Sequence, residues 1–169
     1  REGYAKTQPL DVYRSQRRGG TGKKATSFKE EDFISKLFVA NTHDTLLCFS
    51  SYGKVYWIKV YRLPRAGRNA KGRPIVNLLP LEKDERIQAV LPVSAFEEDK
   101  FVFMATEQGT IKKTSLSAYS RPMKNGIKAI KLKENDKVVN VENTDGAKEI
   151  MLFSDAGKAI RVSEKDARP

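Results

Sequence analysis

The sequence predicts an all-β, propeller-like fold built from blade repeats of about 50 residues, each holding about four short strands. Short runs of alternating apolar and polar residues dominate, and helical periodicity of 3.6 residues is nearly absent. Turn glycines recur at intervals of 50, 56 and 48 residues, at Gly3, Gly53, Gly109 and Gly157. A second glycine follows each of the first three at offsets of 19, 19 and 17 residues, at Gly22, Gly72 and Gly126. Glycines that recur in phase with the apolar runs indicate a blade repeat.

The first complete repeat shows the order of elements that we expect in each blade. Gly53 supplies a positive φ in the tight turn of a hairpin. The expected elements are a strand near 34–42, a turn at His43–Asp44, a hairpin of 45–51 and 54–61, a long loop of 62–73 and a last strand of 74–81. We divide the single domain 1–169 into a partial blade at 1–33, blades at 34–86 and 87–137, and a partial blade at 138–169.

The composition favours a polyanionic partner. The chain holds 32 Lys and Arg against 21 Asp and Glu, a formal net charge of +11, with a pI near 9.7. Nucleic acid is the first expectation; an anionic membrane is not favoured, because the sequence has neither a basic amphipathic helix nor an apolar run of about 18 residues. Cys48 is the single cysteine, so an internal disulfide is impossible. This fits a reducing, cytoplasmic location.

Charge is segregated within each repeat. Three stretches, 14–29, 54–73 and 112–133, are rich in Lys and Arg and hold no acid. They occupy the same part of successive repeats, so we expect one basic edge per blade and a curved basic rim. This predicts contact with phosphates, sequence-tolerant binding and wrapping of duplex DNA. The rim consists of Lys23, Lys24, Lys54, Lys59, Arg62, Arg65, Arg68, Lys71, Arg73, Lys112, Lys113, Arg121, Lys124, Lys128 and Lys131.

One short segment combines two arginines with three glycines. Arginine offers a planar fork for phosphate oxygens, and glycine lets backbone N–H groups come close to an anion. On these residues alone, a DNA-binding loop and a solvated basic loop are equally good interpretations. The segment, called the box loop below, is Gln16, Arg17, Arg18, Gly19, Gly20, Thr21 and Gly22.

The box loop resembles the signature box of the C-terminal domain of the DNA gyrase A subunit, a bacterial type IIA topoisomerase. Thr21 departs from the family pattern, which has a basic residue there. The resemblance covers essentially the whole chain, with further matches at Glu30–Ile34, Val39–Asp44, Gly72–Leu81 and Val102–Thr106. It implies a β-pinwheel whose blades exchange a strand, and a basic perimeter that wraps DNA with positive handedness.

The resemblance also implies a larger enzyme around this chain. The holoenzyme would introduce negative supercoils using ATP and Mg²⁺, with no cofactor bound by this chain and the catalytic residues outside it. The expected partners are double-stranded DNA, the rest of the gyrase A subunit and the gyrase B subunit. The two kinds of subunit would form an A2B2 heterotetramer. The family domain has about six blades, so we expect this chain to be part of a larger domain. Two alternatives stay open: the C-terminal domain of the topoisomerase IV counterpart, and a β-propeller scaffold whose basic rim binds an acidic protein.

Several other residues have both a chemical and a structural interpretation. His43–Asp44 is expected to be a turn and not a catalytic pair, and Cys48 a small core residue. The paired acids at 30–32, 84–85 and 97–98 are expected to be solvated turns and not metal sites. Tyr56, Trp57 and Tyr61 could form a stacking platform for single strands, but we favour core packing.

Overall fold

The computed structural model describes residues 3–13, 15–22, 36–67 and 69–167. Within these ranges the chain is all-β, as predicted, with helical structure confined to turns of three or four residues. The strands are β1 (Tyr4–Ala5), β2 (Thr45–Ser50), β3 (Lys54–Lys59), β4 (Arg73–Pro74), β5 (Ile87–Val93), β6 (Phe101–Thr106), β7 (Ile111–Ser115), β8 (Ile127–Lys128), β9 (Val138–Thr144), β10 (Glu149–Phe153) and β11 (Ala159–Ser163). The 3₁₀ turns are η1 (Leu10–Val12), η2 (Val60–Arg62), η3 (Ile75–Asn77), η4 (Leu116–Tyr119) and η5 (Glu164–Asp166). None of these helical turns has the length or apolar character needed to span a membrane.

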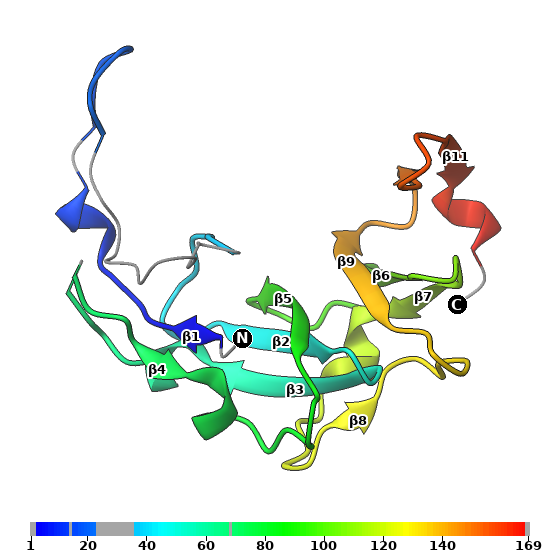
Figure 1. Ribbon diagram of the computed structural model, residues 1–169, viewed down its shortest axis with the longest axis horizontal. Coiled ribbons are helices and arrows are strands. Elements are labelled where there is room, and N and C mark those ends of the chain that lie inside the picture. The colour runs from blue at the N-terminus through cyan, green and yellow to red at the C-terminus, as the bar shows by residue number, and fades with distance from the viewer. Residues whose placement is uncertain (1–2, 14, 23–35, 68, 168–169) are drawn as a thin grey trace.

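The strands form four antiparallel sheets that follow one another along an open curve (Figure 1). Their strand orders are β1-β4, β5-β2-β3-β8, β7-β6-β9 and β10-β11. Gly53, Gly109 and Gly157 close the three hairpins with φ of 73°, 82° and 75°, values that favour glycine. The repeat predicted from these glycines therefore corresponds to one hairpin in each of three sheets, and the β1-β4 sheet pairs two strands that are distant in the sequence.

Neighbouring sheets exchange a short strand. β4 follows the β2–β3 hairpin in the chain but pairs with β1 of the preceding sheet, with Ala5 opposite Arg73. In the same way β8 follows the β6–β7 hairpin but pairs with β3, with Lys54 opposite Lys128. A chain segment from each repeat thus lies on the preceding sheet, which is the exchange that the family resemblance implies.

The sheets also draw a longer strand from the following repeat. β5 pairs along its length with β2, and β9 pairs with β6. The two larger sheets are therefore each assembled from two of the predicted units, 34–86 with 87–137 and 87–137 with 138–169. The hairpin of one unit forms hydrogen bonds with the first strand of the next, because a short turn leaves both hairpin edges open for pairing.

Two predicted strands differ from the observed structure. The described part of the first, residues 36–42, holds no strand and pairs with no strand of the described chain, and Leu37 and Val39 are 84% and 69% exposed. The last strand, predicted at 74–81, ends at Pro74, and the chain turns through η3. Leu78 N–H and Leu79 N–H both donate to Ile75 O, which places Leu79 in a buried cluster.

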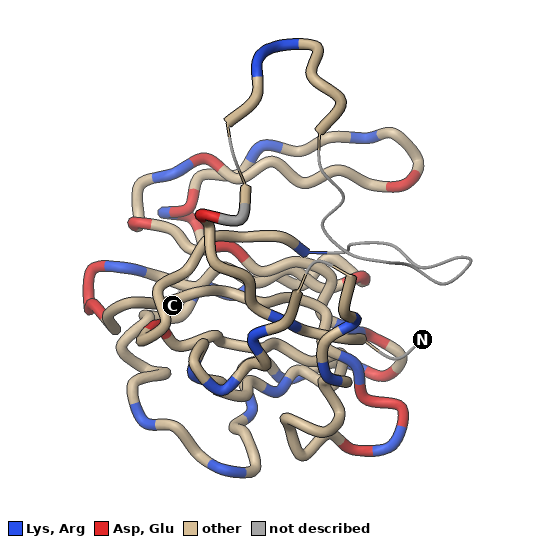
Figure 2. Tube along the Cα trace, turned by 90° about the vertical axis from the view of Figure 1, so that its left-hand side faces the viewer, with Lys and Arg blue, Asp and Glu red and all other residues tan. Residues whose placement is uncertain are grey.

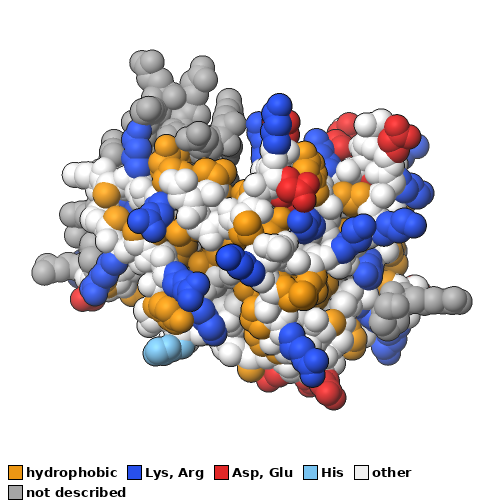
Figure 3. Space-filling view, turned by 90° about the horizontal axis from the view of Figure 1, so that it is seen from below, with side chains coloured by type: hydrophobic (Ala, Val, Ile, Leu, Met, Phe, Trp, Pro, Cys, Tyr) orange, Lys and Arg blue, Asp and Glu red, His pale blue; other side chains and the backbone are white. Residues whose placement is uncertain are grey.

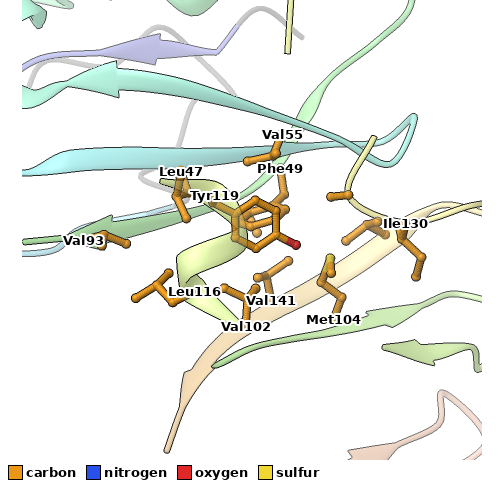
Figure 4. Close-up of a cluster of buried hydrophobic side chains, with 13 residues drawn as sticks. Leu47, Phe49, Val55, Val93, Val102, Met104, Leu116, Tyr119, Ile130 and Val141 are labelled. Carbon is orange, nitrogen blue, oxygen red and sulfur yellow. The ribbon is translucent and has the colours of Figure 1, made fainter. Parts of the chain in front are cut away.

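The four-stranded sheet is buried on both faces. Alternate residues of β2 point to opposite sides, so Leu46 and Cys48 enter one apolar cluster while Leu47 and Phe49 enter another. The second cluster lies between this sheet and the β7-β6-β9 sheet, where Phe49 meets Tyr119 of η4 edge to face at 5.9 Å (Figure 4). Each large side chain buried this way contributes about 1.5–3 kcal/mol. Apolar packing therefore holds the β5-β2-β3-β8 sheet to the β7-β6-β9 sheet.

Candidate nucleic-acid interface

The box loop is exposed along its whole length and projects away from the sheets (Figure 1). Gly20 N–H donates to Arg17 O at 3.1 Å, which closes a tight turn around Arg18 and Gly19. Gly22 N–H donates to Gln16 Oε1 at 2.8 Å, so the glutamine side chain joins the two ends of the loop. Neither guanidinium group forms an ion pair with the described residues, so both are available to an anion.

Eight rim residues are exposed and take part in no ion pair with the described residues. Each belongs to the exchanged strand β4 or β8, to the residues beside it, or to the loop that leads to it. Both strands lie at an open sheet edge. Cations without acidic partners on such an edge retain their attraction for an external anion. They are Arg62, Arg65, Lys71, Arg73, Arg121, Lys124, Lys128 and Lys131.

Three further rim lysines have partners inside the chain. Lys54 Nζ lies 3.1 Å from Glu82 Oε1, and this hydrogen bond raises the pKa of Lys54. Lys59 is exposed and donates to a backbone carbonyl at 3.3 Å, that of His43. Lys112 is half-buried and donates to Ala129 O at 2.8 Å. The ammonium groups of these three lysines are less free to meet an external anion than those of the eight exposed residues.

Lys113 does not belong to the rim. It is only 7% exposed, its ammonium donates to Glu164 O at 3.0 Å, and it lies 5.1 Å from the ring centre of Phe101. Its neighbour Lys112 makes the pair look like one charged patch in the sequence, but successive residues of a strand point to opposite faces. The remaining rim residues, Lys23, Lys24 and Arg68, lie outside the described residues.

A lysine that the sequence analysis did not single out shapes the first basic loop. Lys6 Nζ donates to Gly67 O at 3.1 Å and to Ala70 O at 2.7 Å, and burial lowers its pKa. Ala66 N–H donates to Thr7 O at 3.1 Å, so the loop lies along the preceding sheet. These contacts fix the path of the chain that carries Arg65 and Lys71. The only sequence signal is that Lys6 stands three residues after a turn glycine, as Lys112 does.

Acidic residues are concentrated at turns, and the box loop contains none (Figure 2). One of them corrects the expectation of solvated acidic turns at 84–85. Asp84 is exposed, but Glu85 is 5% exposed and accepts from the Tyr56 hydroxyl at 2.9 Å and from Glu82 N–H at 2.8 Å. A carboxylate with two such donors stabilises the turn that leads into β5. No local pattern reveals this pair, because 29 residues separate Tyr56 from Glu85.

The structure also places the other paired acids and the His43–Asp44 pair. Glu97 and Glu98 are exposed, as expected, whereas residues 30–32 lie outside the described part of the chain. In that part, no three His, Cys, Asp or Glu side chains gather as metal ligands would. Asp44 accepts from Asn41 N–H at 2.9 Å and from Ser94 Oγ at 2.9 Å, which confirms the predicted turn at His43–Asp44.

The three aromatic residues near β3 do not form one surface. Tyr56 is 1% exposed, and Trp57 packs against the inter-blade cluster while its indole N–H donates to Tyr119 O at 2.8 Å. Only Tyr61, 55% exposed and beside the ring of His43, is open to solvent. Core packing is therefore confirmed for Tyr56 and Trp57 and is wrong for Tyr61.

The underside of the molecule carries lysine and arginine side chains spread among apolar ones (Figure 3). No enclosed apolar pocket is needed for a ligand that binds through phosphates, since such a ligand requires an extended row of exposed cations. The box loop and the eight exposed rim residues supply cations of this kind on successive repeats.

The chain matches the family described as "DNA gyrase C-terminal domain, beta-propeller" over residues 1–41, 44–94, 100–145 and 148–169. It is 62% identical over 168 residues to the A subunit of DNA gyrase from Aeromonas salmonicida and 58% identical over 167 residues to that of Escherichia coli strain K12. Each alignment covers 99% of this chain but only 18% and 19% of those proteins.

Two solved domains have similar structures. The C-terminal domain of DNA topoisomerase IV gives a TM-score of 0.79 at 30% identity, covering 98% of this chain and 50% of that one. A DNA gyrase A C-terminal domain gives a TM-score of 0.69 at 26% identity, covering 94% of this chain and 50% of that one. The arrangement of sheets is thus shared with both domains.

Proposed function

This chain belongs to the family of DNA gyrase C-terminal domains, and we propose that it binds duplex DNA independently of sequence and wraps it around its basic perimeter. The observation that carries the proposal is the row of eight exposed Lys and Arg side chains at equivalent places beside the exchanged strands β4 and β8. Phosphates repeat regularly along DNA, and a repeated protein edge presents cations in a matching series.

The absence of a base-reading element in the described chain supports binding without base recognition. Its helical segments are turns of three or four residues, too short to lie in a major groove. Bending 20–30 base pairs costs about 1–6 kcal/mol by elastic estimates. Several phosphate contacts on each of a succession of blades offset this cost, so a curved rim favours wrapping over contact with a straight duplex.

In this proposal the chain is a non-catalytic part of an enzyme that introduces negative supercoils. The gyrase B subunit, together with the rest of the A subunit, would supply strand passage and the use of ATP and Mg²⁺, in a cytoplasmic A2B2 complex. The chain itself would contribute the wrap that presents a second DNA segment for passage. Neither a cofactor nor a membrane has a role in this part of the reaction.

Ligation of nicked circular DNA tests the wrapping. The complete A subunit is titrated onto nicked circles, the nick is sealed, and the topoisomers are resolved on gels after protein removal. We expect the linking number to shift in proportion to bound protein. A variant with Arg121, Lys124 and Lys128 changed to Gln should lose most of this shift, whereas Lys83→Gln, in an acidic turn, should keep it. An unshifted distribution at full occupancy would rule out wrapping.

The similarity to the topoisomerase IV domain supports a second candidate function. That structure has the higher of the two TM-scores, and Thr21 of the box loop lacks the charge of the family pattern. Under this alternative the chain would bind DNA but change the linking number little. A scaffold for an acidic protein would instead bind duplex DNA weakly even at low salt, so the same titration separates the three functions.

A further inference from the structure

A hydrogen bond at one repeat position connects consecutive blades. Four residues after the turn glycine of the β2–β3 hairpin, the Trp57 indole N–H donates to Tyr119 O, in η4 of the next repeat, at 2.8 Å. Four residues after the next turn glycine, Lys113 Nζ donates to Glu164 O, in η5 of the following repeat, at 3.0 Å. Two chemically unrelated side chains thus reach the same kind of 3₁₀ turn from equivalent positions.

The first blade of the chain shows the same connection in a shorter form. Thr7 stands four residues after Gly3, and its N–H and Oγ1 donate to Pro64 O at 2.9 and 3.4 Å. Pro64 lies two residues beyond η2, the corresponding 3₁₀ turn. The position therefore donates a hydrogen bond to the next blade in three successive repeats, at Thr7, Trp57 and Lys113.

The interface made by Lys113 is more polar than the one before it. Phe49 and Tyr119 pack together between the β2–β3 and β6–β7 blades, but the position equivalent to Phe49 in the β6 strand is Ala105. Beyond Thr144, the buried residues in the described chain are Glu164 and Ala167. Few apolar contacts hold the β10–β11 blade to its neighbour, so the hydrogen bond from Lys113 has more influence on its orientation.

The acceptor of this bond is held in place by its own side chain. Glu164 is fully buried, and its carboxylate accepts from Gly146 N–H at 3.0 Å, from Lys148 N–H at 3.0 Å and from the Thr144 hydroxyl. The equivalent residue in the preceding repeats is apolar, for example Leu116 in η4. A buried carboxylate in this place anchors η5 to the loop after β9, and so presents the carbonyl to Lys113 in a fixed direction.

We propose that Lys113 is a positioning residue that sets the angle between the β6–β7 and β10–β11 blades, and thereby the path of DNA between their rims. Its ammonium is too buried to touch a phosphate, so it acts through the blade it holds. Lys112 of β7 and the exposed Lys158, one residue after the turn glycine of the β10–β11 hairpin, belong to these two blades. A rotation between the blades therefore displaces one cation from the curve of the other. This inference rests on the proposed wrapping function.

The angle is measured first, in the complete A subunit, as the distance distribution between spin labels at Ser120 and Asp155. Both residues are exposed and belong to the two blades in question. Lys113→Met keeps the length of the side chain but removes the donor, and should broaden or shift the distribution. Lys113→Arg restores a donor and should return it toward that of the parent. An unchanged distribution in Lys113→Met overturns the inference.

The nicked-circle assay then tests the consequence for DNA. Lys113→Met should reduce the linking-number shift per bound protein by about half or more, while affinity for a straight duplex of about 20 base pairs stays within about twofold. Lys124→Met, which removes an exposed rim cation, should instead lower the affinity and its salt dependence. Equal behaviour of the two variants would contradict a positioning role for Lys113.

The two proposals fail in distinguishable ways. If the parent protein gives no linking-number shift, wrapping is wrong, and the label distances still decide whether Lys113 sets the angle. If Lys113→Met does not fold, as judged by circular dichroism, Glu164→Gln replaces it, because it keeps the carbonyl acceptor and weakens the anchoring of η5. An unchanged label distance and shift in that variant would count against the inference.

Discussion

Lys128 of the exchanged strand β8 lies directly opposite Lys54 of β3, and among the described residues only Lys54 of the two has an acidic partner, Glu82 at 3.1 Å. Like charges in directly opposed positions destabilise an antiparallel pair. A bound phosphate beside Lys128 would remove this repulsion, so the sequence of the edge strand fits an anionic ligand better than it fits the free protein.

The first prediction concerns this lysine. Lys128→Gln should weaken binding to duplex DNA and reduce the magnitude of the slope of log K against log salt by about 0.9, the value for one phosphate contact. It should leave the free protein as stable or slightly more stable, since the repulsion from Lys54 is lost. Lys83→Gln, between Glu82 and Asp84, should change neither. Salt titrations of duplex affinity measure the effect, and equal slopes for parent and Lys128→Gln would contradict it.

The second prediction concerns the glycine that allows strand exchange. Gly72 has φ of 87°, and a Cβ there would lie 2.3 Å from Ala5 O, in the strand that receives β4. Gly72→Ala should therefore lower the free energy of unfolding by more than about 2 kcal/mol, from backbone strain together with the clash. Gly67→Ala is the matched control, because its Cβ meets no atom within 4 Å, and it should be neutral. Denaturant unfolding of the two variants gives the comparison.

The third prediction separates the box loop from the rest of the rim. Replacing Arg17 and Arg18 together by Ala should reduce the linking-number shift on nicked circles more than it weakens plain duplex binding. Gln16→Ala, which removes the acceptor for Gly22 N–H, should act in the same direction but less strongly, since both arginines remain. Losses of shift and of affinity in the same proportion would mean that the box loop is one cationic site among equals.

The fourth prediction follows from the buried thiol. Burial raises the pKa of Cys48 to about 12 from its usual 9.0. Below pH 9 the thiol is protonated in both states and has no effect on stability. Above pH 9 the unfolded thiol loses its proton while the folded one keeps it, so the free energy of unfolding falls as pH rises toward 12. The fall is steeper than in Cys48→Ala by at most about 1.4 kcal/mol per pH unit.

Urea unfolding at a series of alkaline pH values measures this slope. Burial also raises the pKa of Tyr56 and Tyr119, but both tyrosines are present in parent and variant, and their contribution cancels in the difference. Parallel curves for the parent and Cys48→Ala would show that the thiol is not buried in solution.

The hairpins, their order and the phase of the basic stretches could be predicted from the sequence. They depend on local chemistry: alternation places β2 and β3, and the glycine between them provides a positive φ that other residues rarely adopt. The exposure of the eight rim residues could be predicted as well. Loops beside edge strands lie at the surface whatever the arrangement of the blades.

Pairing and burial depended on the tertiary structure. β4 joins β1 across about 70 residues of chain, and nothing local in Arg73–Pro74 indicates which sheet will receive it. Lys113 and Glu85 look like ordinary charged surface residues in the sequence, yet Lys113 is buried against Glu164 O of the next repeat and Glu85 against the Tyr56 hydroxyl of β3. Alternation and turn chemistry act over a few residues, whereas burial of a charge is decided by which distant donors and acceptors the folded chain brings to it.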